Sequence, residues 1–458
     1  MVRIWRGALL LVLLLIYPFF GCGNGTPNGN TFQVVVFSDV HFNPFYDTSL
    51  FSALRAADPS QWAAIFQTSA ITTPSAWGSD SNYPLLVLAL SAIRQNAAAN
   101  PVVLYTGDLI GHNFQTTFFQ LDGDPLPPSA AAVSAMQTFT DKTVAFVAQQ
   151  IRSAVGNVPV MFAVGNIDSY TGYGPDSVFL GDNAQTYYTQ FLNSSVDQTA
   201  FLNTFTSGGY YSAAVGSNLL VIGFNSNPFS PLVPGNNQPA VDAEIAWLDS
   251  TLTAAQAAGQ KVWIIMHVPP GADEGTTATN ADSNGHITSA TMMWTPSYQA
   301  SFLQTLSNHP GVITFAVAAH THMDEFRVLS PNVVLEQEPG ISPVFGNDPA
   351  FKIFTFVDDA HGPIDYRSLN YDRATLPAQF SSYYDFSAAY GLPGSLNSSL
   401  AHLSRQMLTN SFQRATYSGL YQSGHNSANP ITATTWPIFA CGIANVDQTD
   451  FVNCVNGH

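Results

Sequence analysis

Most of the short apolar segments of this chain are followed directly by a residue that can bind a metal ion. The residues concerned are Asp39, His41, Asp108, Asn166, His267, His320 and His322. Carboxylate and amide oxygens combined with imidazole nitrogens suit zinc, iron or manganese. One Asp-x-His pair would carry little weight, because histidines with a purely structural role are common. The recurrence of such residues at the ends of successive apolar segments, by contrast, predicts a metal site.

The segments that position these residues alternate between two kinds. Short apolar runs, typical of buried strands, cover residues 34–37, 102–105, 158–164, 219–224, 262–266 and 313–319. Segments with helical character lie between them at residues 85–96, 131–154, 239–258 and 297–307. This alternation predicts an α/β layered domain with a largely buried sheet. In such sheets, sites assemble at the carboxyl ends of the strands, where the metal-binding residue types stand.

Composition excludes two classes of protein. Hydrophobic residues make up 46% of the 458 residues, enough for a sizeable core, so the chain is not disordered as a whole. Lys and Arg number 13 against 30 Asp and Glu, which gives a formal net charge of -17. Such an acidic chain lacks the cationic surface that holds a phosphate backbone. We therefore expect no stable nucleic-acid complex, and we expect a monomer.

The first residues have the pattern of a secretory signal. Arg3 and Arg6 precede an uncharged apolar run that is shorter than the roughly 20 residues that span a bilayer. Residues 1–21 are predicted to be a signal peptide, and residues 22–30 a flexible tether. Residues 19–22 resemble a bacterial lipobox, which makes Cys22 a candidate lipidation site and a membrane anchor. A plain cleaved signal and a retained anchor are the alternatives. We expect an exported protein, either a bacterial envelope lipoprotein or a secreted one.

The other two cysteines stand close together near the C-terminus. In an oxidising compartment, Cys441 and Cys454 predict a disulfide, with two free buried thiols as the alternative. Beyond about Asp365 the strand signal disappears, and residues 399–421 have helical character. We therefore predict a catalytic domain over residues 31–364 and a C-terminal helical subdomain over residues 365–458.

Taken together, these motifs resemble the signature of the calcineurin-like metallophosphoesterases. More narrowly, the chain resembles the acid sphingomyelinase-like phosphodiesterases over about residues 31–454, without their saposin-like domain. The segments that carry the resemblance are Asp39-Val40-His41, Gly107-Asp108 with His112, Gly165-Asn166, Gly208-Gly209-Tyr210-Tyr211, His267-Val268-Pro269-Pro270-Gly271, His320-Thr321-His322 through Phe326, and Ser342-Pro343 with Asn347 and Pro349.

The resemblance implies two mixed β-sheets packed as a sandwich between helices, with two divalent metal ions. Asp39, His41 and His322 would hold the first ion, and Asn166, His267 and His320 the second. Asp108 would bridge the two ions, and Asn166 would also help to hold the phosphoryl oxygens. Zinc is favoured over iron, because purple acid phosphatases place a ligand tyrosine where this chain has Gly111.

Two further side chains receive roles from the same comparison. His112 would protonate the leaving oxygen, since an imidazole titrates near working pH; a surface-loop histidine is its alternative. Asp324 is a candidate partner of a ligand imidazole, or else a solvated carboxylate.

The third motif departs from the family at Ile167, where many members have a histidine. An isoleucine cannot donate a proton to the leaving group. Three explanations stay open: His112 suffices, another group such as His286 moves in, or the substrate has a leaving group that needs less protonation.

We predict a metal-dependent phosphodiesterase that hydrolyses a lipid or nucleotide diester with an activated hydroxide. The alternatives are an endopolyphosphatase or phosphomonoesterase and, from another class, a non-catalytic phosphate- or lipid-binding lipoprotein.

Overall fold

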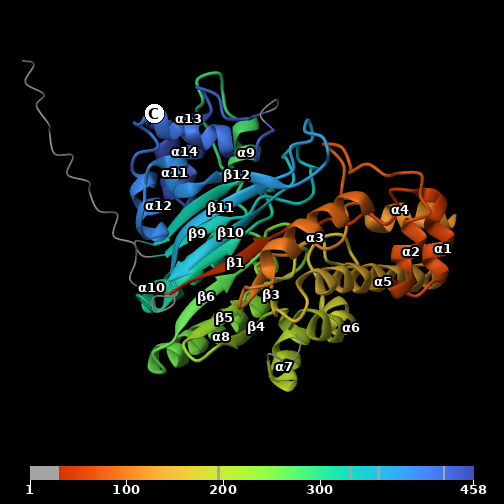
Figure 1. The fold of residues 1–458 in the computed structure, drawn as a ribbon. Helices are drawn as coiled ribbons and strands as arrows, with labels where there is room; N and C mark the ends of the chain where they lie inside the picture. Colours follow the sequence, from red (N-terminus) through yellow and green to blue (C-terminus); the bar gives the residue numbers. More distant parts are fainter. Residues whose placement is uncertain (1–29, 193–195, 331–332, 358–361, 426–428) are drawn as a thin grey trace, which may run out of the picture.

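The computed structural model describes residues 30–192, 196–330, 333–357, 362–425 and 429–458. Two six-stranded sheets form its centre (Figure 1). The first sheet has the order β12 (Ser381–Asp385), β11 (Pro363–Asn370), β10 (Ala350–Val357), β1 (Thr31–Phe37), β2 (Val103–Tyr105) and β3 (Val160–Phe162). The second has the order β4 (Tyr211–Val215), β5 (Leu219–Gly223), β6 (Lys261–Ile265), β7 (Ile313–Ala318), β9 (Val333–Gln337) and β8 (Glu325–Ser330).

Both sheets are mixed. In the first, β1, β2 and β3 are parallel, and β10 joins β1 antiparallel. In the second, β5, β6 and β7 are parallel, and β4 joins β5 antiparallel. Parallel strands are buried on both faces and need helices on the outer side. Residues Val34 to Phe37 of β1 are accordingly fully buried.

Helices cover the outer faces of the sheets, and aromatic rings join the inner faces. The helix α3 (Tyr83–Ala97) packs on β1 and on α5 (Ala130–Val155), while α8 (Gln238–Ala257) packs on β6 and on α10 (Pro296–Asn308). Between the sheets, the ring of Trp263 lies 4.3 Å from that of Phe356. The shorter helices of this part are α1 (Phe51–Ala56), α2 (Trp62–Phe66), α4 (Phe114–Asp122), α6 (Ser177–Tyr187), α7 (Gln198–Gly208) and α9 (Glu274–Thr279). The predicted arrangement of two mixed sheets flanked by helices is confirmed.

The predicted absence of strands beyond Asp365 is wrong. β11 contains that residue, and β12 follows it at the edge of the first sheet. The strand signal is weak here because β11 carries polar residues such as Arg367 and Ser368, which are held by its neighbours β10 and β12. β12 is a partly exposed edge strand with the polar sequence SSYYD. The proposed domain boundary at residue 365 therefore falls inside a strand, and the division into two domains stays a prediction.

Helices do dominate the chain after β12. They are α11 (Phe386–Tyr390), α12 (Leu396–Ser404), α13 (Ser411–Leu420), α14 (Trp436–Ala444) and α15 (Gln448–Asn456). Most of them gather beside β11 and β12, on the side away from α3 and α5 (Figure 1). The predicted disulfide between Cys441 and Cys454 is present and joins α14 to α15. Within the described ranges, no helix is both long and apolar enough to cross a membrane. The predicted signal peptide and Cys22 lie outside the described residues.

Candidate metal centre

The strands deliver all seven predicted metal-binding residues to one edge of the sandwich. Asp39 and His41 follow β1, Asp108 follows β2, and Asn166 follows β3 from the first sheet. From the second sheet, His267 follows β6, and His320 and His322 follow β7. Parallel strands end at the same edge of a sheet, so the two sheets bring these side chains together between them.

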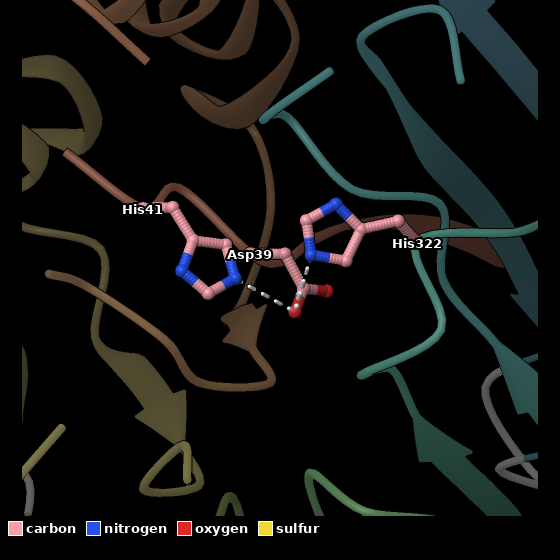
Figure 2. Close-up of side chains that lie close together, drawn as sticks. All are labelled: Asp39, His41 and His322. Atoms are coloured by element: carbon pink, nitrogen blue, oxygen red, sulfur yellow. Dashed lines mark ion pairs between the residues drawn. The ribbon is translucent and has the colours of Figure 1, made fainter. Parts of the chain in front are cut away.

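Three of these side chains form a first cluster, with two imidazoles on either side of one carboxylate (Figure 2). The Oδ1 atom of Asp39 lies 3.6 Å from Nε2 of His41 and 3.4 Å from Nε2 of His322. All three residues are buried, and neither the Asp39 oxygens nor these two nitrogens have a hydrogen-bond partner. Buried polar atoms without partners are costly in a native protein. Their convergence fits a cation held between them.

The amide oxygen of Asn166 organises a second cluster. It lies 2.7 Å from Nε2 of His267 and 2.8 Å from Nδ1 of His320. An amide oxygen and two imidazole nitrogens facing one point are a donor set that zinc and related ions bind.

Asp108 stands between the two clusters. Its Oδ2 atom lies 3.3 Å from Nε2 of His41 in the first cluster and 3.1 Å from Nε2 of His267 in the second. Its other oxygen accepts a hydrogen bond from the backbone N–H of Ile167, at 2.8 Å. One oxygen facing both clusters is the geometry that a bridging carboxylate needs.

The backbone is strained at most of these positions. Five of the seven residues have positive φ angles: Asp39 at 49°, His41 at 40°, Asp108 at 63°, His320 at 76° and His322 at 65°. Elsewhere in the described chain, only Asn113 and Ser423 share this conformation among non-glycine residues. Such backbone costs on the order of 1–3 kcal/mol per residue and collects at functional sites. The surrounding fold evidently holds these side chains in place against that cost.

Glycines and carbonyl oxygens set the side-chain orientations. A Cβ atom on Gly165 would stand 2.0 Å from Oδ1 of Asp108, so only glycine fits there. The Nδ1 atoms of three rings face backbone carbonyls, which leaves each Nε2 directed into the clusters. These contacts are His41 to Ile110 at 3.1 Å, His267 to Thr106 at 2.8 Å, and His322 to Ser342 at 3.0 Å.

Charge also favours a cation at this site. Burial is the largest single influence on His41 and His267 and would lower the pKa of each, but the surrounding carboxylates, Asp108 first and then Asp39, together outweigh it and raise each pKa to about 9. Burial lowers the pKa of His320 and of His322 to about 4. Protons on two of the imidazoles thus balance the carboxylates, and a metal ion would displace those protons on binding.

Comparison with known proteins agrees with this geometry. The model of the calcineurin-like phosphoesterase family matches residues 32–324, a segment that contains all seven residues. The chain belongs to this family. The predicted resemblance is therefore confirmed at the level of the family, and the chain is a metallophosphoesterase.

Its curated relatives are similar over most of its length. The cyclic GMP-AMP phosphodiesterase SMPDL3A of Rattus norvegicus is 24% identical over 478 residues, which cover 98% of both chains. The sphingomyelinase phosphodiesterase D of Dictyostelium discoideum is 24% identical over 88% of this chain and 89% of that protein. The sphingomyelin phosphodiesterase of Homo sapiens is 24% identical over 77% of this chain and 54% of its own. These relatives also confirm the resemblance to the acid sphingomyelinase-like branch. Among solved structures, a dimetal phosphatase from Danio rerio matches with a TM-score of 0.42 and 14% identity, over 78% of this chain and 98% of that one.

Two carboxylates that the sequence analysis did not include help to hold the candidate metal centre of this metallophosphoesterase in place. Asp168 is buried and accepts hydrogen bonds from the backbone N–H groups of Asp108, Leu109, Ile110 and Gly165, at 3.1, 2.7, 3.3 and 3.1 Å. It thereby ties the loop after β2 to the loop after β3. Its position two residues after Asn166, next to a motif of the sequence, could have identified Asp168 as part of the site.

Asp80 is the second such carboxylate, and it holds His112. One of its oxygens accepts from the backbone N–H of His112 at 2.7 Å, and the other lies 2.8 Å from the ring Nδ1. The His112 ring stacks on that of His41, with 4.2 Å between centroids. Gly111 leaves room for this contact, because a Cβ atom there would stand 3.0 Å from Asp80. No motif in the sequence marks Asp80.

The predicted role of Asp324 is wrong. Its carboxylate does not contact a ligand imidazole; it lies 2.9 Å from Nζ of the buried Lys352 and accepts a hydrogen bond from Tyr384. The imidazoles find their outer partners on backbone carbonyls instead, and the carboxylate serves to neutralise a cation in the core.

A cleft of about 520 Å³ opens over the metallophosphoesterase site. His112 and Ile167 line it, together with the half-exposed ring of Phe345. Among the described residues that line the cleft there is no Lys or Arg, and Asp273 is part of its wall. His286 is not part of this wall; it is 51% exposed and lies beside Asp282.

Proposed function

We propose that this metallophosphoesterase hydrolyses phosphodiesters with two divalent metal ions, of which zinc is favoured. Asp39, His41 and His322 would hold one ion. Asn166, His267 and His320 would hold the other, and Asp108 would contact both ions. The position of Asp108 Oδ2 between the two clusters carries this proposal. When bound, such a pair of ions supplies an activated water and neutralises charge on the phosphoryl oxygens.

His112 would give the proton to the leaving oxygen. Because Asp80 faces its Nδ1, the opposite nitrogen, Nε2, is left to face a substrate. The ring lines the cleft and is 25% exposed, so a substrate can reach it. Ile167 lines the same cleft but offers no proton. Since His286 stands outside the cleft wall, His112 alone serves as the acid, or the natural leaving group needs little protonation.

The charge of the cleft favours a diester over a monoester or a polyphosphate. A diester carries one negative charge at the phosphoryl group, whereas the other two carry more. The described residues that line the cleft include no Lys or Arg to pair with additional negative charge, and Asp273 stands in the wall, so the cleft suits the least negative of the three. Two of the relatives are named as phosphodiesterases of cyclic GMP-AMP and of sphingomyelin, which supports the same choice.

The test is hydrolysis of bis(p-nitrophenyl) phosphate beside p-nitrophenyl phosphate, from about pH 4 to 8, after chelation and after zinc is returned. We expect activity that returns with zinc and favours the diester. A preference for the monoester would overturn the diester proposal in favour of a phosphatase. Zinc binding without turnover of either ester would overturn the diester proposal in favour of a non-catalytic binding protein or of a polyphosphatase that does not cleave aryl esters.

We also propose that the protein is exported and, through Cys22, anchored to a bacterial envelope as a monomer. The disulfide supports export, because such bonds persist in oxidising compartments. Mass spectrometry of the mature N-terminus tests the anchor: a diacylglycerol on Cys22 is expected, and an unmodified N-terminus would refute it.

A further inference from the structure

A second pocket, of about 470 Å³, lies beside the metal cleft. Tyr173 lines both cavities, so the two adjoin at this residue. The second pocket lies among α6, the end of α7 and the first turns of α8, and Glu244 is among its lining residues. It also contains Gly208 and Tyr210, from a sequence motif that has no part in the metal centre.

The glycine pair of this motif shapes the pocket. Gly209 ends α7 in the left-handed conformation, with φ at 73°, and a Cβ atom there would stand 2.8 Å from Nδ2 of Asn225. This space lets the Asn225 amide approach the turn and donate to the carbonyl of Gly208 at 2.8 Å. The ring of Tyr210 then packs on Trp247, with 4.6 Å between centroids. One side of the pocket is thus formed by the Asn225 amide and the Tyr210 ring, and each is fixed in position by these contacts.

Glu244 gives the pocket an unusual hydrogen-bonding group. Its side chain is 1% exposed, and one carboxyl oxygen accepts the backbone N–H of Asn225 at 2.7 Å. Throughout the described ranges, no Lys, Arg or His forms an ion pair with it. Burial raises the pKa of Glu244 well above its ordinary value, and a carboxyl group buried without a cationic partner favours its neutral form, which has an O–H to donate. A neutral acid that lines a pocket can bind a hydroxyl or carbonyl oxygen of a ligand.

The remaining lining offers no partner for an anionic ligand group. Among the described residues of this pocket there is no Lys, Arg or His to bind an anion. The other carboxylate, Asp176, is occupied at the start of α6, where it accepts the N–H groups of Val178 and Phe179 at 3.1 and 2.9 Å. What is left is aromatic rings, prolines and neutral polar groups, a lining that suits an uncharged, hydroxylated group.

We propose that this pocket binds an uncharged, hydroxyl-bearing ring on the substrate, the class to which the sugar of a nucleoside and an inositol both belong. The inference rests on the proposed phosphodiesterase function. The leaving oxygen must face His112, which does not line this pocket. The ring in the pocket therefore belongs to the arm that stays on the phosphate.

The first test compares diesters that share a p-nitrophenol leaving group and differ in the other arm: methyl, thymidine 5′ or inositol. In the zinc-loaded wild type we expect kcat/KM to be higher for a ring-bearing arm than for methyl. Glu244→Leu should lower that ratio by about tenfold, the size of one lost hydrogen bond to a ligand. Glu244→Gln keeps a neutral donor and should keep the ratio. A ratio that Glu244→Leu leaves unchanged would overturn the inference, because support of Asn225 alone would slow all three diesters equally.

A binding measurement separates this inference from the proposed function. Calorimetry of the zinc-loaded protein with thymidine and with inositol needs no turnover. Binding of either probe in the wild type, lost in Glu244→Leu, supports the pocket, and the probe that binds shows whether the ring comes from a nucleoside or a polyol. If Glu244→Leu does not fold, Tyr210→Leu serves in its place, with the partly buried Tyr298→Leu as a matched control outside the pocket. No binding of either probe overturns the inference, whatever the enzyme hydrolyses.

Discussion

Replacing Asp80 by asparagine tests how the proposed acid is held. The variant keeps one neutral acceptor oxygen but loses the carboxylate that faces both the backbone and the ring of His112. A hydrogen bond to a charged group contributes about 1.5–3 kcal/mol, and part of this remains with asparagine. The loss in kcat should therefore be roughly tenfold to thirtyfold where the acid limits the rate.

The size of this loss should depend on the leaving group. An alkoxide needs a proton when it leaves, whereas p-nitrophenolate leaves readily without one. The assay measures kcat for methyl phosphodiesters of p-nitrophenol, phenol and an alkyl alcohol, in the wild type and in Asp80→Asn. We expect the ratio of the two rates to be near one for p-nitrophenol and to grow as the leaving group becomes poorer. The exposed Asp282→Asn is a matched control.

Two results would refute this reasoning. An equal loss for every leaving group would show that Asp80 does not act through proton donation. A fall in bound zinc would show that Asp80 itself binds a metal ion, since it lies with His41 and His112 in a group of potential ligands. Zinc per protein is therefore measured beside each rate.

Three more changes have defined outcomes. Asp108→Asn should lose both metal ions and nearly all turnover, because one oxygen faces both clusters; full activity, or full zinc content by elemental analysis, would remove it from the bridging position. Ile167→His should speed the hydrolysis of diesters with poor leaving groups, and no gain in kcat on an alkyl diester would show that His112 suffices. Burial raises the pKa of Glu336 to about 7, so this carboxyl stabilises the fold below its unfolded pKa, near pH 4.5, and that contribution is lost as the pH rises through 7. The melting temperature should accordingly fall between pH 5 and 8, with a shallower fall in Glu336→Gln; equal slopes would contradict the assignment.

The inner strands could be predicted because their sequences are almost entirely apolar, as expected of strands buried on both faces. β1, β2, β3, β5, β6 and β7 are short apolar runs, and each lies close to its predicted range. The later strands contain charged residues that are buried in the core, so these strands cannot be recognised as apolar runs in the sequence. β9 ends in buried Glu336 and Gln337, and β8 contains the buried Arg327, whose guanidinium pairs with Glu274 at 2.7 Å. In the sequence alone, a charged residue that is buried beside a distant partner looks like an exposed loop residue, because its partner is not known.

The proposed metal ligands can be recognised in the sequence more easily than the residues that support them. A proposed ligand stands at a strand end, so its spacing from an apolar run marks it, as at Asp39 and His267. A supporting carboxylate only needs to accept N–H groups, and any loop that reaches the right place can supply it. Asp168 is close to a motif, but Asp80 lies in a loop before α3 with no pattern around it. The same freedom explains Asp324. Although it is close in sequence to His320 and His322, its carboxylate contacts neither ring and pairs with Lys352 of β10 instead. Spacing along the chain therefore predicts which atoms bind metal, while the support of those atoms depends on how loops cross in three dimensions.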